Sequence, residues 1–306
     1  MRGLFFPVLI LLLCSVKTGV SQTQTESPAS AVDKGGARAQ YELAQNFAKG
    51  NGVPKDYVKA AQYMRLAADQ GYAEAQIALG AFYGRGQGVL RNVTTAVQWY
   101  RKAAEQGNPL AQYAMGNFYA DGQGVTNDYT EAVHWWRMAA EQNQVDAQVA
   151  LGKMHLFPGA FGTNYLDFAA ASRWFYRAAK LGSAAAMNQL GEMYDNGLGV
   201  KINFNTAAGW YRAAAELGDD GGQANLGQLY FAGRGVPRDY VQAYKWLKLS
   251  ANQGNPIAAN FIGDFQMKPL LTPEQLAEAK QLVQDFKPKT GLTNEIKEVS
   301  VSNIGG

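Results

Sequence analysis

Residues 73–108 read AEAQIALGAFYGRGQGVLRNVTTAVQWYRKAAEQGN, and residues 109–144 read PLAQYAMGNFYADGQGVTNDYTEAVHWWRMAAEQNQ. The two stretches have the same length and agree at most of their small, aromatic and glycine positions. A fixed period of this size is the signature of a repeat protein, in which each unit packs against the next. Units of this kind start at Ala37, Ala73, Pro109, Val145, Ala184, Asp220 and Pro256; the fourth is three residues longer than the other full units, and the seventh is shortened.

Each unit reads as two short helices joined by a turn. In the unit at 73–108, small and apolar side chains recur at helical spacing until Gly86 and Gly88, which favour a turn because glycine adopts positive φ without a Cβ clash. Asn92 is the predicted N-cap of the second helix, which ends at Gly107. Helices of about 15–20 Å are too short to be stable alone, so they must pack against neighbours.

Some positions of the unit always carry a small residue, and another carries a large aromatic one. A glycine that recurs inside the first helix costs about 1 kcal/mol relative to alanine, which indicates a close helix crossing. We interpret the tryptophans of the second helix as core residues, since aromatic side chains at helical spacing usually pack. The glycines are Gly80, Gly116, Gly152, Gly191, Gly227 and Gly263; the matching alanines are Ala96, Ala132, Ala171, Ala207 and Ala243; the aromatic row is Tyr63, Trp99, Trp135, Trp174, Trp210 and Trp246.

The unit resembles the Sel-one-like repeat, a relative of the tetratricopeptide repeat. The resemblance covers residues 37–286. It implies an all-α fold, a right-handed superhelical α-solenoid of antiparallel helix pairs that scaffolds protein complexes, and it implies no reaction. The residues of 73–108 that carry the resemblance are Ala75-Gln76, Leu79-Gly80, Tyr83, Gly86, Gly88-Val89, Ala96, Trp99, Ala103-Ala104 and Gly107.

The repeats define the organisation of the chain. A signal peptide is predicted at 1–21, a flexible leader at 22–36 and a disordered tail at 287–306. Atypical end repeats are expected of a solenoid, and the N-cap Thr272 with Gln275 predicts a capping box in the last unit. The solenoid at 37–286 divides into units 37–72, 73–108, 109–144, 145–183, 184–219 and 220–255 and a capping half-repeat at 256–286.

The first residues predict the compartment. Arg2 precedes a short apolar run from Leu4 to Val16, which is typical of a signal peptide and too short to span a bilayer. We expect cleavage near Gln22 and a periplasmic or secreted mature chain without a membrane span; lipid attachment at Cys14 is the less favoured alternative. The chain carries 28 basic and 25 acidic residues, a balance that gives no argument for nucleic acid as a partner.

We find no constellation of residues that carries a known chemistry. His134 and His155 are the only histidines and stand in different units, and Cys14 is the only cysteine, so the sequence predicts no metal site, no cofactor and no catalytic residue. One branch of the resembled family is cysteine-rich and has been associated with β-lactam binding, and this sequence departs from that branch.

A row of cations recurs in the second helices: Arg65, Arg101, Arg137, Arg212 and Lys248. Acidic residues follow four positions later at Asp69, Glu105, Glu141 and Glu216. Because residues at i and i+4 are neighbours on a helix, we interpret the row as a solvated, paired face.

In solenoids of this kind the first helices line the concave face, and this places the candidate site. The fifth residues of the first four units, Tyr41, Ile77, Tyr113 and Val149, are apolar or aromatic, and the ninth residues beside them are Gln45, Ala81, Asn117 and Lys153. The strip suits an extended peptide or a helix face. The alternative is that the neighbouring unit covers these side chains.

The loop of the fourth unit is the second candidate. Phe157 and Phe161 make it aromatic, and loops on rigid scaffolds often carry function. The alternative is a tolerated insertion whose aromatic residues fold back on the array.

The sequence therefore predicts a monomeric, non-enzymatic scaffold or adaptor of the bacterial envelope, which binds a protein or peptide along its concave groove. The alternative function is a cell-wall-related enzyme or glycan-binding protein, β-lactamase-like or peptidoglycan-associated.

Overall fold

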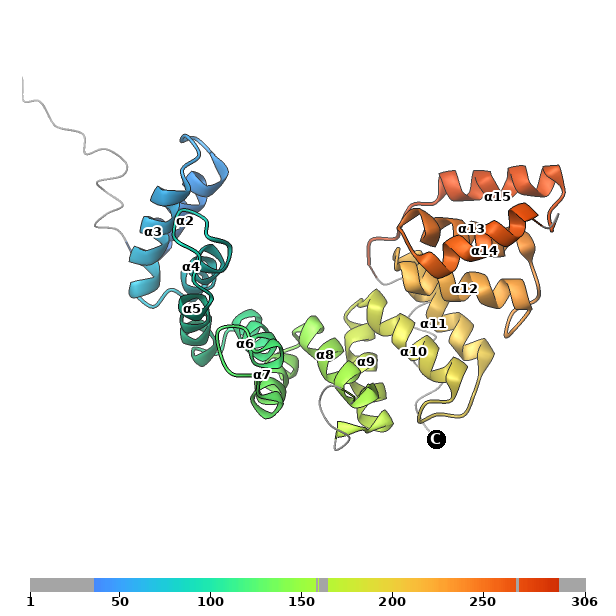
Figure 1. Cartoon of the computed structure of the whole chain (residues 1–306), viewed down its shortest axis with the longest axis horizontal. Helices are drawn as coiled ribbons and strands as arrows, with labels where there is room; N and C mark the ends of the chain where they lie inside the picture. The colour runs from blue at the N-terminus through green and yellow to red at the C-terminus, as the bar shows by residue number, and fades with distance from the viewer. Residues whose placement is uncertain (1–35, 158, 160–164, 268–269, 292–306) are drawn as a thin grey trace, which may run out of the picture.

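A computed structural model describes residues 36–157, 159, 165–267 and 270–291. The signal peptide predicted at 1–21 and Phe161 of the loop lie outside these residues. All regular elements of the described part are α-helices, and they follow one another in pairs along an arc whose first and last pairs rise at its two ends (Figure 1). The fold is the expected right-handed superhelical α-solenoid of antiparallel helix pairs.

Each repeat unit contributes one helix pair, and the first helix of each pair starts at the residue where the sequence unit starts. The first helices are α2 (Ala37–Lys49), α4 (Ala73–Arg85), α6 (Pro109–Asp121), α8 (Val145–Leu156), α10 (Ala184–Asn196), α12 (Asp220–Ala232) and α14 (Pro256–Met267). The second helices are α3 (Tyr57–Asp69), α5 (Val93–Glu105), α7 (Tyr129–Glu141), α9 (Phe168–Lys180), α11 (Phe204–Glu216), α13 (Tyr240–Asn252) and α15 (Pro273–Asp285).

Side chains and glycines cap the helices locally. Asn92 Oδ1 accepts a hydrogen bond of 2.9 Å from the Thr95 backbone N–H, which confirms the predicted N-cap of α5. Gly86 ends α4 with φ +72°, a left-handed conformation that a side chain would strain. Thr272 and Gln275 form the predicted capping box at the start of α15.

The glycine inside the first helix marks a close crossing within the pair. A Cβ on Gly80 would lie 2.7 Å from Tyr100 of α5, and a Cβ on Gly116 would overlap the indole of Trp136. The same position meets Phe175 in the fourth unit. The expected close crossing is confirmed there, whereas in the last unit a Cβ on Gly263 would meet no atom within 4 Å.

A second glycine holds successive pairs together. Gly88 has φ +65°, and its α-carbon faces the first turn of α3 in the preceding unit so closely that a Cβ would overlap the Tyr57 carbonyl. A Cβ on Gly235 would likewise overlap the carbonyl of Phe204 of α11. The turn of one unit is therefore a docking point on the previous unit, which explains why two glycines recur in it.

The tryptophan row of the second helices is largely core. Trp99, Trp135, Trp210 and Trp246 are buried, whereas Trp174 of the fourth unit is half-buried. The alanine row at the matching position is buried in every unit in which it occurs. The hydrophobic clusters that result span consecutive units, as the one containing Met64, Leu79 and Trp99 does.

Buried glutamines also link the units. Gln76 of α4 donates to the Ala68 carbonyl at the end of α3, and its Oε1 accepts a hydrogen bond of 2.7 Å from Gln106 Nε2 after α5. The arrangement recurs, with distances of 2.6 to 2.9 Å between the two side chains, for Gln40 with Gln70, Gln112 with Gln142 and Gln223 with Gln253. We call these four pairs the glutamine ladder.

The glutamine ladder is interrupted in the middle of the array. Gln148 is fully buried and still donates to the Ala140 carbonyl, but Leu181 stands where its partner glutamine would be. Among the described residues, Gln148 Oε1 is consequently a buried acceptor without a donor. In the fifth unit both positions are apolar, Met187 and Leu217, so no polar atom is left over.

Within the part of the chain that the structure describes, no cation of the row forms an ion pair with the acidic residue four positions later, contrary to the expectation from the i, i+4 spacing. Arg101 Nη2 donates to the Tyr119 hydroxyl of the next unit at 2.7 Å, and Arg212 Nη2 donates to the Tyr230 hydroxyl at 2.9 Å. Arg65 donates to Tyr83 in the same way. The reason is geometric: the tyrosine of the following first helix lies across the arginine, and its ring also receives the guanidinium.

The last helix and the segment that follows it close the array. Phe286 packs its ring edge-to-face on Trp246 of α13, and Lys289 Nζ lies 2.7 Å from Glu216 Oε2 of α11. The described start of the tail, 287–291, therefore contacts the solenoid, although we expected it to lack fixed structure.

Candidate protein-binding groove

The four predicted apolar residues of the groove lie on α2, α4, α6 and α8 and are all half-buried. Tyr41 contacts Tyr72 with ring centroids 5.3 Å apart, and Tyr113 packs against the core cluster of α7 and α8. Ile77 and Val149 likewise contact core clusters. Each side chain is thus partly covered by its neighbours and partly open to solvent. This lies between the two alternatives drawn from the sequence, an open binding strip and a strip covered by the neighbouring unit.

The ninth residues of the same helices differ in their surroundings. Gln45 and Ala81 are half-buried, whereas Lys153 of α8 is exposed. Asn117 is half-buried, and its Oδ1 accepts a hydrogen bond of 3.0 Å from Trp136 Nε1. Asn117 therefore orients a core indole, and Lys153 is the member of the strip whose side chain is freest to meet a partner.

Further along, the same positions carry a polar network. Glu192 of α10 is half-buried, and its two carboxylate oxygens accept from Asn188 Nδ2 at 3.0 Å and from Gln189 Nε2 at 2.9 Å. Asn225 of α12 donates to Asn188 Oδ1 at 2.9 Å, which ties the fifth unit to the sixth. Burial raises the pKa of the Glu192 carboxyl above its ordinary value, and the three amides oppose that rise.

Lys153 and the polar network belong to one electrostatic environment. Asp219, the N-cap of α12, accepts a hydrogen bond of 2.6 Å from the Gly222 backbone N–H. Burial, and to a smaller extent the charge of Asp220, raise the pKa of the Asp219 carboxyl, whereas the hydrogen bond from Gly222 and the charge of Lys153 lower it. The charge of Lys153 in the fourth unit thus acts on the N-cap of the sixth unit.

The loop of the fourth unit partly folds back on the solenoid. His155 Nδ1 lies 2.8 Å from the Tyr165 carbonyl, and Tyr165 packs against the core cluster of α7 and α8. Phe157 leaves 54% of its surface exposed, and Phe161 lies outside the described residues. The structure thus brings Tyr165 to the array and leaves Phe157 available for contact.

The described part of the chain offers no group of three or more histidine, cysteine, aspartate or glutamate side chains that could hold a metal ion. Within the same residues, no helix combines the length and apolar character needed to cross a membrane.

The amide network around Glu192 was not identified from the sequence as a unit. Asn188 and Glu192 stand at the fifth and ninth positions of the fifth unit, so the alignment of the repeats places them on the groove. Gln189 and Asn225 occupy the sixth position, where the earlier units carry alanine or glutamate, and that substitution was the available signal.

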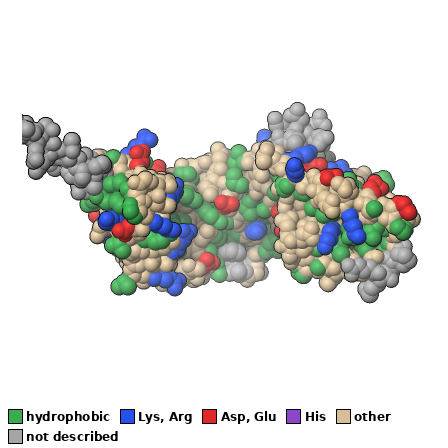
Figure 2. Space-filling model, turned by 90° about the horizontal axis from the view of Figure 1, so that it is seen from above, with side chains coloured by type: hydrophobic (Ala, Val, Ile, Leu, Met, Phe, Trp, Pro, Cys, Tyr) green, Lys and Arg blue, Asp and Glu red, His purple; other side chains and the backbone are tan. Residues whose placement is uncertain are grey.

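The surface of the array is mixed in character. Figure 2 shows the molecule from above, relative to the view in Figure 1. In this view the middle of the molecule is recessed between its two ends and displays hydrophobic and uncharged side chains with a few charged ones.

Comparisons with known proteins agree with this architecture. The family profile described as Sel1 repeat matches residues 37–72, 73–108, 109–144, 145–183, 184–219 and 221–255. No curated protein matches the sequence.

Two solved structures of bacterial proteins resemble the chain over most of its length. The Escherichia coli protein c5321, a protective antigen present in uropathogenic strains, shares 36% identity with a TM-score of 0.73; the match covers 84% of this chain and 55% of c5321. A Sel1 repeat protein from Oxalobacter formigenes shares 33% identity with a TM-score of 0.70, over 78% of this chain and 68% of that protein. The chain thus spans little more than half the length of c5321.

Proposed function

Because the chain belongs to the Sel1 repeat family, we propose that it is a non-enzymatic scaffold or adaptor of the bacterial envelope, which binds a partner protein or peptide along the face formed by its first helices. Proteins of this family are generally protein-interaction scaffolds and are typically not catalytic. No observation on the described residues favours the alternative of a cell-wall-related enzyme or glycan-binding protein.

The observation that carries the proposal is the change in chemistry along one continuous face. The strip Tyr41, Ile77, Tyr113 and Val149 is apolar and half-buried, and it is followed by the amide network around Glu192. Partly open apolar side chains in a row favour association with another apolar surface. The polar network at the other end would set the direction of that partner, because an apolar side chain placed against it would desolvate its amides and carboxylate.

The partner is a polypeptide segment with matching asymmetry. Apolar side chains would face the strip on α2, α4, α6 and α8, and hydrogen-bonding side chains would face α10 and α12. Lys153, exposed and between the two regions, would meet an acidic or carbonyl group of the partner. The chain would act as a monomer, since the repeats stack within one chain.

The location in the envelope is supported by the predicted signal peptide at 1–21 and by the bacterial origin of both similar structures. Fractionation of producing cells tests this location. The mature chain should be recovered in the periplasmic or culture fraction, and its first residue should lie near Gln22. Retention in the membrane with lipid on Cys14 would contradict it.

Two matched charge reversals test the binding face. Lys153→Glu alters the exposed residue of the strip, and Arg137→Glu makes the same change on an exposed residue of the second helix α7. A protein retained from envelope extract by the unaltered chain should be lost with Lys153→Glu and kept with Arg137→Glu. Equal retention by both variants, or loss only with Arg137→Glu, would place the binding face elsewhere.

A further inference from the structure

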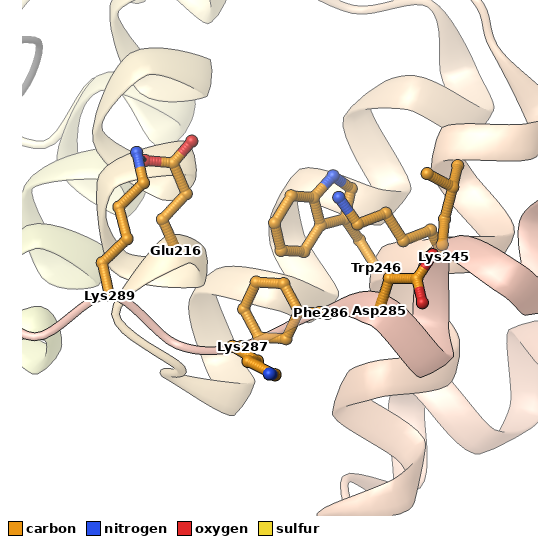
Figure 3. Close-up of a pocket in the computed structure, with 8 residues that line it drawn as sticks. Glu216, Lys245, Trp246, Asp285, Phe286, Lys287 and Lys289 are labelled. Carbon is orange, nitrogen blue, oxygen red and sulfur yellow. Dashed lines mark hydrogen bonds and ion pairs between the residues drawn. The ribbon is translucent and has the colours of Figure 1, made fainter.

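A pocket of about 300 Å³ lies at the C-terminal end of the array, between the end of α11, the middle of α13 and the segment that leaves α15 (Figure 3). It is formed by parts of the chain far apart in the sequence. None of its residues belongs to the strip on the first helices, so the pocket is independent of the groove proposed above.

One wall of the pocket is apolar. Trp246 of α13 and Phe286 pack edge-to-face, with ring centroids 5.4 Å apart and planes inclined by 76°. Trp246 is 5% exposed, whereas Leu282 of α15 and Phe286 just after it are half-buried and line the pocket. A bound molecule would therefore find an aromatic surface already fixed in place.

The two carboxylates of the pocket are engaged by other groups. Glu216 accepts from Lys289 Nζ at 2.7 Å, and the backbone N–H of Lys289 donates to the Glu216 carbonyl at 2.8 Å. Asp285 Oδ1 accepts from Gln281 Nε2 at 2.9 Å. The Glu216 carboxylate is thus occupied by an ion pair, whereas the Asp285 carboxylate keeps its negative charge, because a neutral amide does not compensate it.

Once Lys289 and Glu216 are paired, two lysines, Lys245 and Lys287, remain in the pocket with one carboxylate, that of Asp285, so positive charge is in excess. Lys245 Nζ lies 4.1 Å from the ring centroid of Trp246 and 5.7 Å from that of Phe286, and within the described residues it forms no ion pair. Lys287 is exposed at the rim and likewise has no carboxylate within ion-pair distance among those residues. An aromatic ring compensates only part of the lost hydration of an ammonium group.

Burial lowers the pKa of the Lys245 ammonium, and the nearby negative charge of Glu216 only partly restores it. An anion delivered to this point would find a cation that is poorly hydrated and free of a competing partner, which strengthens an ion pair relative to one on the open surface.

We propose that the pocket binds a carboxylate attached to an apolar ring or chain. The carboxylate pairs with Lys245, Lys287 adds positive potential at the rim, and the apolar part lies on Phe286 and Leu282. The two sources of such a group are a free small organic acid and the C-terminal carboxylate of a polypeptide.

The test uses the full mature chain and phenylacetate as probe, with phenylacetamide as the uncharged match. Binding is followed through the ¹⁵N-labelled indole signal of Trp246, assigned with a Trp246→Phe variant. We expect saturable shifts with phenylacetate and none with phenylacetamide.

A peptide ending in phenylalanine, with a free and with an amidated terminus, forms the second arm. Binding of the free-terminus peptide alone assigns the pocket to polypeptide termini, and binding of phenylacetate assigns it to small acids; absence of both, or equal binding of the amides, overturns the proposal.

Three variants fix the assignment. Lys245→Gln should weaken binding by about tenfold, the cost of one charge-assisted contact, while Lys245→Arg should retain it. Lys280→Gln, the same change on the exposed face of α15, should leave affinity unchanged. Weakening by Lys280→Gln to the same extent would show a general charge effect and overturn the proposal.

Discussion

Leu181→Gln should stabilise the protein by restoring the missing step of the glutamine ladder. In the other steps a glutamine after the second helix donates to the buried glutamine of its own unit, as Gln106 does to Gln76 Oε1 at 2.7 Å. Leu181 takes that place in the fourth unit, and Gln148 Oε1 is buried without a donor. The variant supplies the donor without disturbing the core, since Leu181 leaves 47% of its surface exposed.

The magnitude follows from one hydrogen bond. A neutral intramolecular bond contributes about 1 kcal/mol net, and a buried acceptor left unsatisfied costs about 1–3 kcal/mol. We therefore expect the free energy of unfolding to rise by about 1 kcal/mol, and Tm by about 2–4 °C for an array of this size.

Thermal and urea unfolding followed by circular dichroism measure the effect, and Leu217→Gln is the matched control. Leu217 occupies the same position in the fifth unit and packs against the core cluster that contains the apolar Met187, so a glutamine there finds no matching acceptor and should not stabilise. If Leu181→Gln leaves Tm unchanged or lowers it, or if both variants gain equally, the ladder does not stabilise the array as described.

Three further outcomes follow from the core and the polar network. Trp135→Ala should lower the free energy of unfolding by about 3–5 kcal/mol, because it leaves a cavity in the core; an unchanged melting curve would show that the row is surface. Gly116→Ala should destabilise by about 1–3 kcal/mol through overlap with Trp136, whereas Gly263→Ala should gain up to about 1 kcal/mol, because there a Cβ meets nothing within 4 Å. Burial raises the pKa of Glu192 above 4.5 in the folded state, so its contribution to stability is complete below the ordinary value and is lost as pH rises through the raised one. Tm of the unaltered chain should accordingly fall relative to that of Glu192→Gln over this range, and a constant difference would contradict the assignment.

The features that could be predicted from the sequence depend on local geometry. Asn92 is an N-cap because its side chain reaches a backbone N–H three residues away. The recurring glycine of the first helix indicates a close crossing because glycine is costly inside a helix, and at Gly116 the structure shows Trp136 as the side chain that a Cβ would overlap.

The features that could not be predicted join residues of different helices or different units. Arg101 has an acidic residue four positions later on its own helix, yet it donates to Tyr119, 18 residues away, because the next unit brings that hydroxyl closer. The pocket beside Lys245 depends on the path of the chain after α15, which no periodicity describes.

Site-specific photocrosslinking tests the proposed binding face most directly. A photoreactive amino acid is placed at position 153 on the first helix α8 or at position 137 on the second helix α7, and producing cells are irradiated. Our account predicts a discrete adduct with one partner polypeptide at position 153 and none at position 137. An adduct only at position 137, or the same adducts at both, would contradict binding along the first helices.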